Sequence, residues 1–415
     1  MQKARRRRPL PLQTQINSRR RAMVMVALAL GAFGIGTTEF VSMGLLSMIA
    51  DDFGITENTA GHAISAYALG VVVGAPIITA VTGKMPRRLL LILMGAFTLG
   101  NALSVVAGSY PILLAARFIA GLPHGAYFSV AGLVAASMAP EGKRGKSVAL
   151  VGMGLSVATV FGVPAAQALG AALGWHAAYV LVACIGIATA TSLWFLLPHM
   201  TEMPATSVRT ELGAFKRSQV WLTLAMGTVG FGGMFAIYTY ISWTMTTHAG
   251  MDPSSMWIVL MAYGIGNVAG AYFGGVLSDR SLEKGILFSL VMIAVSLVCF
   301  YFTSSSAVLG TINFGVVGFF GSSLTPTLQV RLMHVAGDAQ TLAAALNHSA
   351  LNLANASGAA LGGAVVGAGF SYQAPALAGA GLAIASIGVW FVTMALKPRG
   401  RGKSTSRASV VQTES

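Results

Sequence analysis

The stretch AMVMVALALGAFGIGTTEFVSMGLLSM, residues 22–48, decides the fold class of this chain. It contains one charged side chain, Glu39, and is longer than the roughly 20 apolar residues that a helix needs to cross a bilayer. An acidic side chain inside such a helix costs about 2.5–3.5 kcal/mol on insertion scales, and residues of this kind carry protons, ions or charged substrates. The stretch therefore predicts a membrane-spanning helix with a functional carboxyl group.

The composition of the whole chain is that of a protein embedded in a membrane. Hydrophobic residues make up 55% of the 415 residues and charged residues only 9%, whereas a soluble domain carries about 25% charged residues. We therefore predict an all-α membrane protein with twelve transmembrane helices. The first run is too long for the core of a signal peptide, so we interpret it as an uncleaved span. The predicted spans are 22–48, 59–82, 89–107, 110–138, 146–170, 176–197, 220–247, 255–278, 285–303, 306–330, 341–369 and 374–396.

Basic residues alternate between the two sides of these spans. Of the 26 lysine and arginine residues, 25 lie before the first span or after an even-numbered span, and Arg117 lies inside the fourth. The opposite loops contain acidic residues such as Asp51 and Asp252 but no lysine or arginine. Because basic loops stay on the cytoplasmic side of a membrane, we expect both termini to be cytoplasmic.

The net charge of +14 follows from the same pattern and requires no nucleic-acid partner. The run Arg5–Arg8 precedes the first span, where basic residues orient the helix and contact anionic lipids; binding to another partner is the alternative. Cys184 and Cys299 fall inside predicted spans, where we expect them to be packing residues. Two cysteines provide neither a disulfide framework nor a metal cluster, and the sequence predicts no cofactor.

The predicted domains follow from the longest connection between spans. The polar stretch 198–219 carries charges of both signs and separates six spans on each side. Two six-helix halves joined in this way are typical of carriers whose site lies between the halves near the middle of the membrane. The predicted divisions are a basic cytoplasmic N-tail (1–21), an N-terminal half (22–197), a cytoplasmic linker (198–219), a C-terminal half (220–397) and a disordered cytoplasmic C-tail (398–415).

Five stretches resemble one family of transporters. They are Gly34–Phe40 (GIGTTEF), Arg117–Ala126 (RFIAGLPHGA), Gly162–Pro164 (GVP), Gly275–Arg280 (GVLSDR) and Leu346–Asn355 (LNHSALNLAN). On these residues the chain resembles the drug/proton antiporter branch of the major facilitator superfamily. Within that branch it is similar to the arabinose-efflux-permease-like proteins, which include sugar exporters and chloramphenicol-resistance pumps. The resemblance covers about residues 22–397 and implies a monomer in the cytoplasmic (inner) membrane of a bacterium.

Glu39 and Arg117 are the candidate proton-coupling residues. Glu39 lies nine residues from the outer end of span 1 at Met48, and Arg117 lies seven residues from the outer end of span 4 at Tyr110. At about 1.5 Å per residue the two lie at nearly the same depth. A buried carboxylate tends to neutralise by binding a proton, whereas a neighbouring arginine favours its ionised form. The resemblance implies that spans 1 and 4 line the central cavity; a fixed ion pair that only sets helix register is the alternative.

The candidate gating residues lie toward the two ends of the spans. Gly162 permits close helix packing and Pro164 bends a helix, and the resemblance implies a bend that seals the outer end of exporters. Asp279 and Arg280 retain the loop motif of the family, in which charges near helix ends latch the inner gate. The first half departs from that motif, because Gly83 stands where the family has an acid. Ordinary packing and anchoring by basic residues are the alternatives.

Three aromatic residues of span 7 are candidates for the substrate cavity. The resemblance implies that span 7 faces this cavity, where Phe235, Tyr238 and Tyr240 would form an apolar wall with hydroxyl groups for a drug-sized ligand. An aromatic belt at the membrane interface is the alternative.

Polar residues of spans 4 and 11 are further candidates for the cavity. His124 lies seven residues after Arg117 and so on the same helix face, where it would relay protons or simply pack. Asn352 and Asn355 share one face of span 11 with His348. They would line the cavity or make hydrogen bonds between helices.

The sequence as a whole predicts a proton-coupled efflux transporter that works by alternating access on a small molecule such as a drug, sugar or metabolite. A symporter or facilitator that imports a sugar or metabolite is the main alternative, and a sensor built on a carrier scaffold is another. An intramembrane enzyme would need paired acids, a metal cluster or an activated nucleophile, and Glu39 with scattered histidines does not supply these. We therefore do not expect an enzyme.

Overall fold

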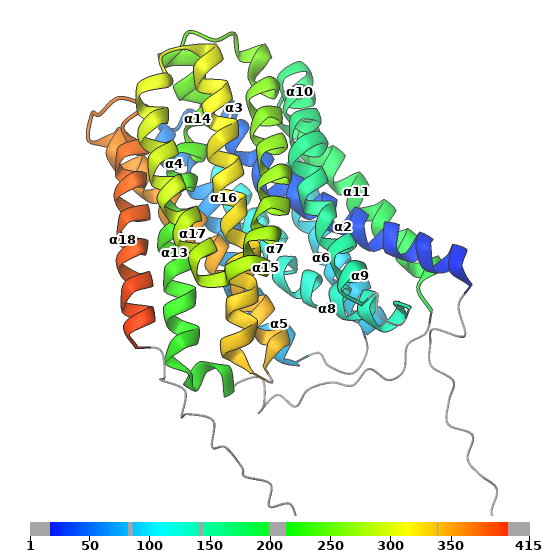
Figure 1. Cartoon of the computed structure of the whole chain (residues 1–415). Helices are drawn as coiled ribbons and strands as arrows, with labels where there is room; N and C mark the ends of the chain where they lie inside the picture. The colour runs from blue at the N-terminus through cyan, green and yellow to red at the C-terminus, as the bar shows by residue number, and fades with distance from the viewer. Residues whose placement is uncertain (1–16, 82–85, 141–143, 199–212, 338, 397–415) are drawn as a thin grey trace, which may run out of the picture.

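The computed structural model describes residues 17–81, 86–140, 144–198, 213–337 and 339–396, and the regular elements in these ranges are helical (Figure 1). The N-half contains α2 (Ser18–Gly44), α3 (Leu46–Phe53), α4 (Glu57–Ala60), α5 (His62–Val81), α6 (Pro86–Val105), α7 (Tyr110–Gly121), α8 (His124–Met138), α9 (Arg144–Val157), α10 (Val163–Leu173) and α11 (Trp175–Leu196). The C-half contains α13 (Ser218–Thr239), α14 (Ile241–Trp243), α15 (Met256–Thr303), α16 (Ala307–Ala336), α17 (Gln340–Gly367) and α18 (Pro375–Ala395). Short turns complete the list: π-helical at Ala158–Gly162 and Thr244–His248, and 3₁₀ at Gly213–Lys216 and Pro253–Ser255.

Helices occupy all twelve predicted ranges, but they are not twelve separate helices. Among the described residues, nine helices are long and apolar enough to cross a membrane. One of them, α15, contains two predicted spans that meet at a kink, where Ser281 has extended backbone angles. The helices α5 and α17 lie in the predicted ranges for spans 2 and 11 but are not among the nine. The count of twelve spans stays a prediction.

The first helix of the N-half begins before the predicted start of that half at residue 22. Helix α2 begins at Ser18, so that Arg19–Arg21 form its first turn instead of belonging to a tail. Asn17 accepts a hydrogen bond of 2.7 Å from the Arg20 amide. Because this cap satisfies an N–H that the helix leaves unpaired, the helix extends beyond the apolar run. Most of the predicted linker (199–212) and the predicted C-tail (398–415) lie outside the described residues.

The two cysteines correct a further expectation, because neither is buried. Cys184 on α11 and Cys299 on α15 are both exposed. They share the outer surface with large apolar side chains such as Phe195 and Phe302, which are 71% and 72% exposed. In a membrane protein such a surface contacts lipid, so these cysteines do not pack in the core.

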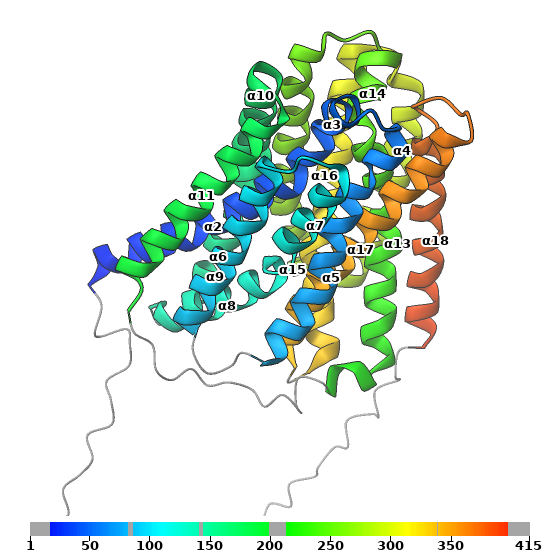
Figure 2. The ribbon, with the colours of Figure 1, turned by 180° about the vertical axis from the view of Figure 1, so that it is seen from behind.

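The two halves meet at one end of the molecule and separate toward the other. In Figures 1 and 2, α3, α4 and α14 cluster at the upper end. From there α13 and α18 run down one side, while α2 and α11 slope away to the other side. We call the end with α3, α4 and α14 the upper end, and the end with the start of α2 and the end of α18 the lower end.

Close backbone packing joins the halves above the lower end. Helix α17 packs along α5, and α15 packs against α10 and the π-helical turn Ala158–Gly162. At Gly264 of α15, an added Cβ atom would lie only 2.1 Å from the carbonyl oxygen of Thr159 in that turn. Glycine is therefore required there for the halves to approach this closely.

We predict that Gly264→Ala disfavours the state in which the upper end is closed. The added methyl group overlaps a backbone atom of the opposite half, and overpacking of this kind costs about 1–3 kcal/mol. We expect the ratio of closed to open molecules to fall about tenfold, since 1.4 kcal/mol corresponds to a factor of ten.

The distance across the lower end is measured by energy transfer between two fluorescent dyes. We call the protein that carries these two dyes the dye-labelled protein. The dyes are attached through Ser18→Cys on α2 and Ser218→Cys on α13, both exposed positions, after Cys184→Ser and Cys299→Ser. Closing the lower end should shorten the mean dye distance. Gly381→Ala on α18 is the matched control, because an added Cβ at Gly381 has no neighbour within 4 Å. An unchanged dye distance in Gly264→Ala would contradict the prediction.

Candidate functional site

Glu39 lies in α2 with its carboxyl group buried between the two halves. The residue is 6% exposed, and its carboxyl group interacts with the side chain of Asn352 on α17 of the opposite half. Arg117 on α7 lies within electrostatic range of the same carboxyl group, as do the hydroxyl groups of Tyr67 and Tyr238. A single carboxyl group is thus surrounded by polar groups from both halves.

Arg117 is held in place by α2 and by two aromatic rings. Its guanidinium group donates to the hydroxyl of Thr38 at 2.8 Å and to the carbonyl oxygen of Thr38 at 3.1 Å. The guanidinium carbon lies 4.5 Å from the ring centre of Tyr67 and 5.4 Å from that of Tyr179. These contacts bring Arg117 to the level of Glu39, which is the neighbour of Thr38. No direct ion pair joins Arg117 to Glu39 in the described part of the chain.

Close packing between α5 and α7 explains how Tyr67 reaches Arg117. An added Cβ at Gly121 of α7 would lie 2.1 Å from the Tyr67 carbonyl oxygen, and one at Gly70 of α5 would lie 2.2 Å from the Phe118 carbonyl oxygen. Because both positions are glycine, the two helix backbones touch. The Tyr67 ring is thereby placed against the guanidinium group.

The aromatic candidates of span 7 lie at different places. Tyr238 is 1% exposed and packs against Phe40 of the N-half, with ring centres 5.7 Å apart. It also packs edge-on against Tyr263 at 4.5 Å. Phe235 is buried and packs on α17, whereas Tyr240 is buried near the upper end beside Gly363. Tyr238 is therefore the member of this group that borders the surroundings of Glu39.

His124 and His348, which come from opposite halves, lie next to each other. His124 on α8 accepts from or donates to the Tyr67 hydroxyl through Nδ1 at 3.0 Å. Its ring centre lies 5.4 Å from that of His348 on α17, and the His348 ring stacks on Phe128 at 4.7 Å. The sequence pointed to His124 and His348 on their separate helices. No sequence pattern indicated that α8 and α17 pack against each other at these residues.

The amide side chains of α17 are buried at the same contact between halves. Asn352 donates to the backbone oxygen of His348 at 3.1 Å in addition to its interaction with Glu39. Asn355 is 0% exposed, and within the described residues its amide group has no hydrogen-bond partner. An unpaired buried amide is costly, so Asn355 is suited to bind a polar ligand. Among the described residues, no three His, Cys, Asp or Glu side chains come together as metal ligands.

The gating candidates of span 5 lie at a local change in helix geometry. A π-helical turn, Ala158–Gly162, ends directly before Val163 and Pro164, which begin α10. An added Cβ at Gly162 would lie 2.2 Å from the Thr37 hydroxyl, so this turn packs tightly on α2. Such π-turns frequently mark functional sites in helices.

The lower end of the C-half contains an ion pair that the sequence analysis missed. The predicted latch residues Asp279 and Arg280 are exposed. Nearby, Arg331 is 2% exposed and forms an ion pair with Glu283, and it also donates to Gln219 at 3.0 Å. The predicted span 306–330 ends one residue before Arg331, whereas α16 continues to Ala336 and includes it. The sequence feature that could have indicated its buried role is that Arg331 is a single basic residue at the end of an apolar run.

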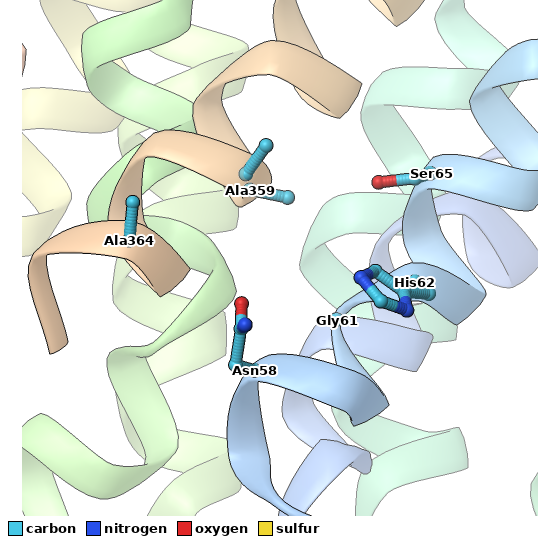
Figure 3. Close-up of a pocket in the computed structure, with 7 residues that line it drawn as sticks. Asn58, Gly61, His62, Ser65, Ala359 and Ala364 are labelled. Atoms are coloured by element: carbon cyan, nitrogen blue, oxygen red, sulfur yellow. The ribbon is translucent and has the colours of Figure 1, made fainter. Parts of the chain in front are cut away.

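A polar contact joins the halves at the upper end. The hydroxyl of Tyr372, between α17 and α18, donates to a carboxylate oxygen of Glu57 on α4 at 2.5 Å. Burial and this hydrogen bond raise the pKa of Tyr372 to about 12. A small pocket of about 150 Å³ lies along the same seam, between Asn58, His62 and Ser65 on one side and Ala359 and Ala364 on the other (Figure 3).

Comparisons with known proteins agree with this architecture. A model of the Major Facilitator Superfamily matches residues 28–243 and 224–413. The inner membrane transport protein YdhP of Escherichia coli (strain K12) is 40% identical over 348 residues, which are 83% of this chain and 89% of that protein. The chloramphenicol resistance protein of Streptomyces lividans is 32% identical over 330 residues, 78% of this chain and 84% of that protein. A bacterial homologue of the human lysosomal transporter Spinster, crystallised in an inward-facing and occupied conformation, matches 92% of this chain and 98% of its own, with a TM-score of 0.71 and 14% identity.

Two helical halves with a candidate site between them are the arrangement typical of membrane carriers. The chain belongs to the major facilitator superfamily. It is a multi-pass transport protein of the inner membrane and not an enzyme.

We predict that Tyr372→Phe weakens closure of the upper end about fivefold, because it removes a hydrogen bond of about 1 kcal/mol between halves. We expect a cysteine at Ser65 to react faster with a membrane-impermeant thiol reagent in the Tyr372→Phe variant, after Cys184→Ser and Cys299→Ser. Tyr272→Phe is the control, since Tyr272 is 79% exposed on the outer surface.

The same contact should depend on pH in one direction. Tyr372 donates only while it is protonated, and its pKa is raised from the usual value near 10 to about 12. The contribution of the contact is therefore fully present below about pH 10 and is lost as the pH rises through about 12. Equal reaction rates for the Tyr372→Phe variant and the parent protein near neutral pH would contradict the proposed contact.

Proposed function

We propose that this protein is a proton-coupled exporter that exchanges inward-moving protons for an outward-moving small molecule. The observation that carries the proposal is the buried carboxyl group of Glu39, which has partners from both halves. When the halves move relative to each other, Asn352 moves away from or toward this group. The affinity of Glu39 for a proton then differs between the two open states, as coupling requires.

Arg117 influences the proton affinity of the Glu39 carboxyl group without forming an ion pair with it. Its hydrogen bonds to Thr38 and its stacking on Tyr67 fix the positive charge on the N-half. The charge therefore stays near Glu39 while Asn352 is exchanged for water or substrate. Tyr238 and the unpaired amide of Asn355 offer an apolar face and a polar group to a substrate in the same region.

The two ends of the molecule act as gates. Close packing of the turn Ala158–Gly162, which precedes Pro164, against Gly264 seals the upper end in this state. Asp279 and Arg280 are exposed at the lower end, where the halves are apart, and are free to latch the inner gate when it closes.

The upper end faces outward in this proposal, and both termini are cytoplasmic. The distribution of lysine and arginine supports this orientation. The chain functions as a monomer of two six-helix halves, residues 22–197 and 220–397, and needs no cofactor.

We predict that a reporter enzyme active only in the cytoplasm is active when fused after Leu396 and inactive when fused after Asp252. Asp252 lies in the loop between α14 and α15 at the upper end. The opposite pattern would reverse the orientation, and with it the direction of the proposed exchange.

We predict that Glu39→Gln abolishes transport driven by a pH gradient and leaves folding largely intact, because glutamine keeps the shape and hydrogen bonds of the side chain but cannot exchange a proton. The compound to be transported is found first by comparing drug resistance and metabolite export of a deletion strain with those of an overexpressing strain. Chloramphenicol is the first compound to test, given the similarity to a chloramphenicol resistance protein.

Everted membrane vesicles provide the measurement. Wild-type protein should accumulate the compound when the vesicle interior is acidified, and the Glu39→Gln protein should not, at equal amounts of protein in the membrane. Unchanged accumulation would refute the role of Glu39. In proteoliposomes, adding the compound should drive protons the opposite way across the membrane; flow of protons with the compound would identify a symporter instead.

A further inference from the structure

Three titratable side chains form a chain of contacts that starts beside Glu39. The Tyr67 hydroxyl on α5 lies within electrostatic range of Glu39 and is 3.0 Å from Nδ1 of His124 on α8. The His124 ring in turn lies 5.4 Å, between ring centres, from the ring of His348 on α17. The contacts therefore lead from the N-half into the C-half.

This chain of contacts runs toward the lower end. Tyr110 lies at the upper end, where its hydroxyl bonds to the carbonyl oxygen of Thr59. His124 follows Arg117 by seven residues along the same span, which places it roughly 10 Å closer to the lower end at about 1.5 Å per residue.

Exposure increases along the same direction. Tyr67 and His124 are each 1% exposed, whereas His348 retains partial exposure. His348 lies where α17 packs on α8, between the two halves and not on the outer surface. The final member of the chain is therefore the one that is not fully buried.

The groups that face these rings are consistent with proton transfer. The guanidinium carbon of Arg117 lies 4.5 Å from the ring centre of Tyr67, the first member of the chain. Asn352 binds the His348 backbone oxygen at 3.1 Å and also interacts with Glu39. The other neighbour of His348, Phe128, carries no proton and stacks on the ring at 4.7 Å. The titratable and charged groups that the described contacts place around the histidines are therefore Tyr67, Arg117, Glu39 and the histidines themselves.

We propose that Tyr67, His124 and His348 form a relay that carries the proton released by Glu39 to the lower side of the membrane. The inference rests on the proposed function, because it needs Glu39 to release a proton in this state. The Tyr67 hydroxyl oxygen takes the proton from Glu39 as its own proton passes to Nδ1 of His124. The other ring nitrogen of His124 gives its proton to a ring nitrogen of His348, which releases one to water. Glu39 is left ionised, and the net change is one proton moved to the lower side.

Histidine suits this role because one nitrogen of its neutral ring accepts a proton while the other donates one, so that a proton can enter on one side of the ring as another leaves on the other side. A packing role alone predicts a different pattern. If the two histidines only filled space between α8 and α17, replacing their neighbour Phe128 would disturb the protein as much as replacing a histidine.

The test measures how fast the dye-labelled protein changes conformation after a rapid pH jump from acidic to neutral, with no substrate present. Loss of a positioned acid–base group should slow proton transfer by about 100-fold. Tyr67→Phe, which keeps the ring under Arg117, and His124→Gln should slow the change by this factor. The final dye distance should stay the same, because the relay affects the rate and not the equilibrium.

Two controls and a rescue separate the relay from packing. Phe128→Leu and His62→Gln, an exposed histidine at the upper end, should leave the rate unchanged. Azide, a small weak acid that carries protons, should accelerate the relay variants but not the wild type. If Tyr67→Phe does not fold, His348→Gln at the partly exposed end provides the same test.

Each outcome is decisive for one of the two proposals. Wild-type rates in the Tyr67 and His124 variants, or equal slowing by Phe128→Leu, would overturn the relay. A response to pH that persists in Glu39→Gln would instead overturn the proposed coupling through Glu39. Slow relay variants, normal controls and rescue by azide would establish the relay.

Discussion

The proposed exchange depends on one carboxyl group that is buried between the two halves of the molecule. Glu39 interacts with Asn352 of the opposite half, while Arg117 is fixed by Thr38 and Tyr67 on its own side. Burying an ionisable group in a membrane is expensive unless it has partners. Because one of these partners belongs to the other half, any movement of the halves changes the surroundings of the carboxyl group. In the proposed exchange, this is how proton binding is linked to conformation.

Glycine determines how closely the halves and the helices within them can approach. At Gly264 the backbone of α15 touches the π-helical turn of span 5, and at Gly121 the backbone of α7 touches α5. The first contact joins the two halves, and the second places Tyr67 against Arg117. A protein with 50 glycines in 415 residues can form such contacts repeatedly. Helix association in lipid relies on this close packing, since lipid chains are as apolar as the side chains.

The relative position of Glu39 and Arg117 was accessible from the sequence because helix rise is constant. Counting residues from the ends of two spans gives depth, and the hydrogen bonds of Arg117 to Thr38 agree with that count. Counting residues could not predict which groups the side chains of Glu39 and Arg117 contact. Depth alone suggested a pair, whereas the guanidinium group binds the backbone and hydroxyl of Thr38. The latch predicted at Asp279 and Arg280 was likewise chosen from a motif, and the ion pair found nearby joins Glu283 to Arg331.

The sequence by itself determined the membrane class, the helical ranges, the family and the candidate carboxyl group. These follow from hydrophobicity, charge and motifs, which are properties of residues near each other in the chain. Only the tertiary structure decided that His124 meets His348, that Asn352 reaches Glu39 and that Tyr372 bonds to Glu57. Each of these contacts joins residues from opposite halves. They depend on the rotation of each helix about its axis and on where two helices cross, and no local pattern in one helix encodes the face of another.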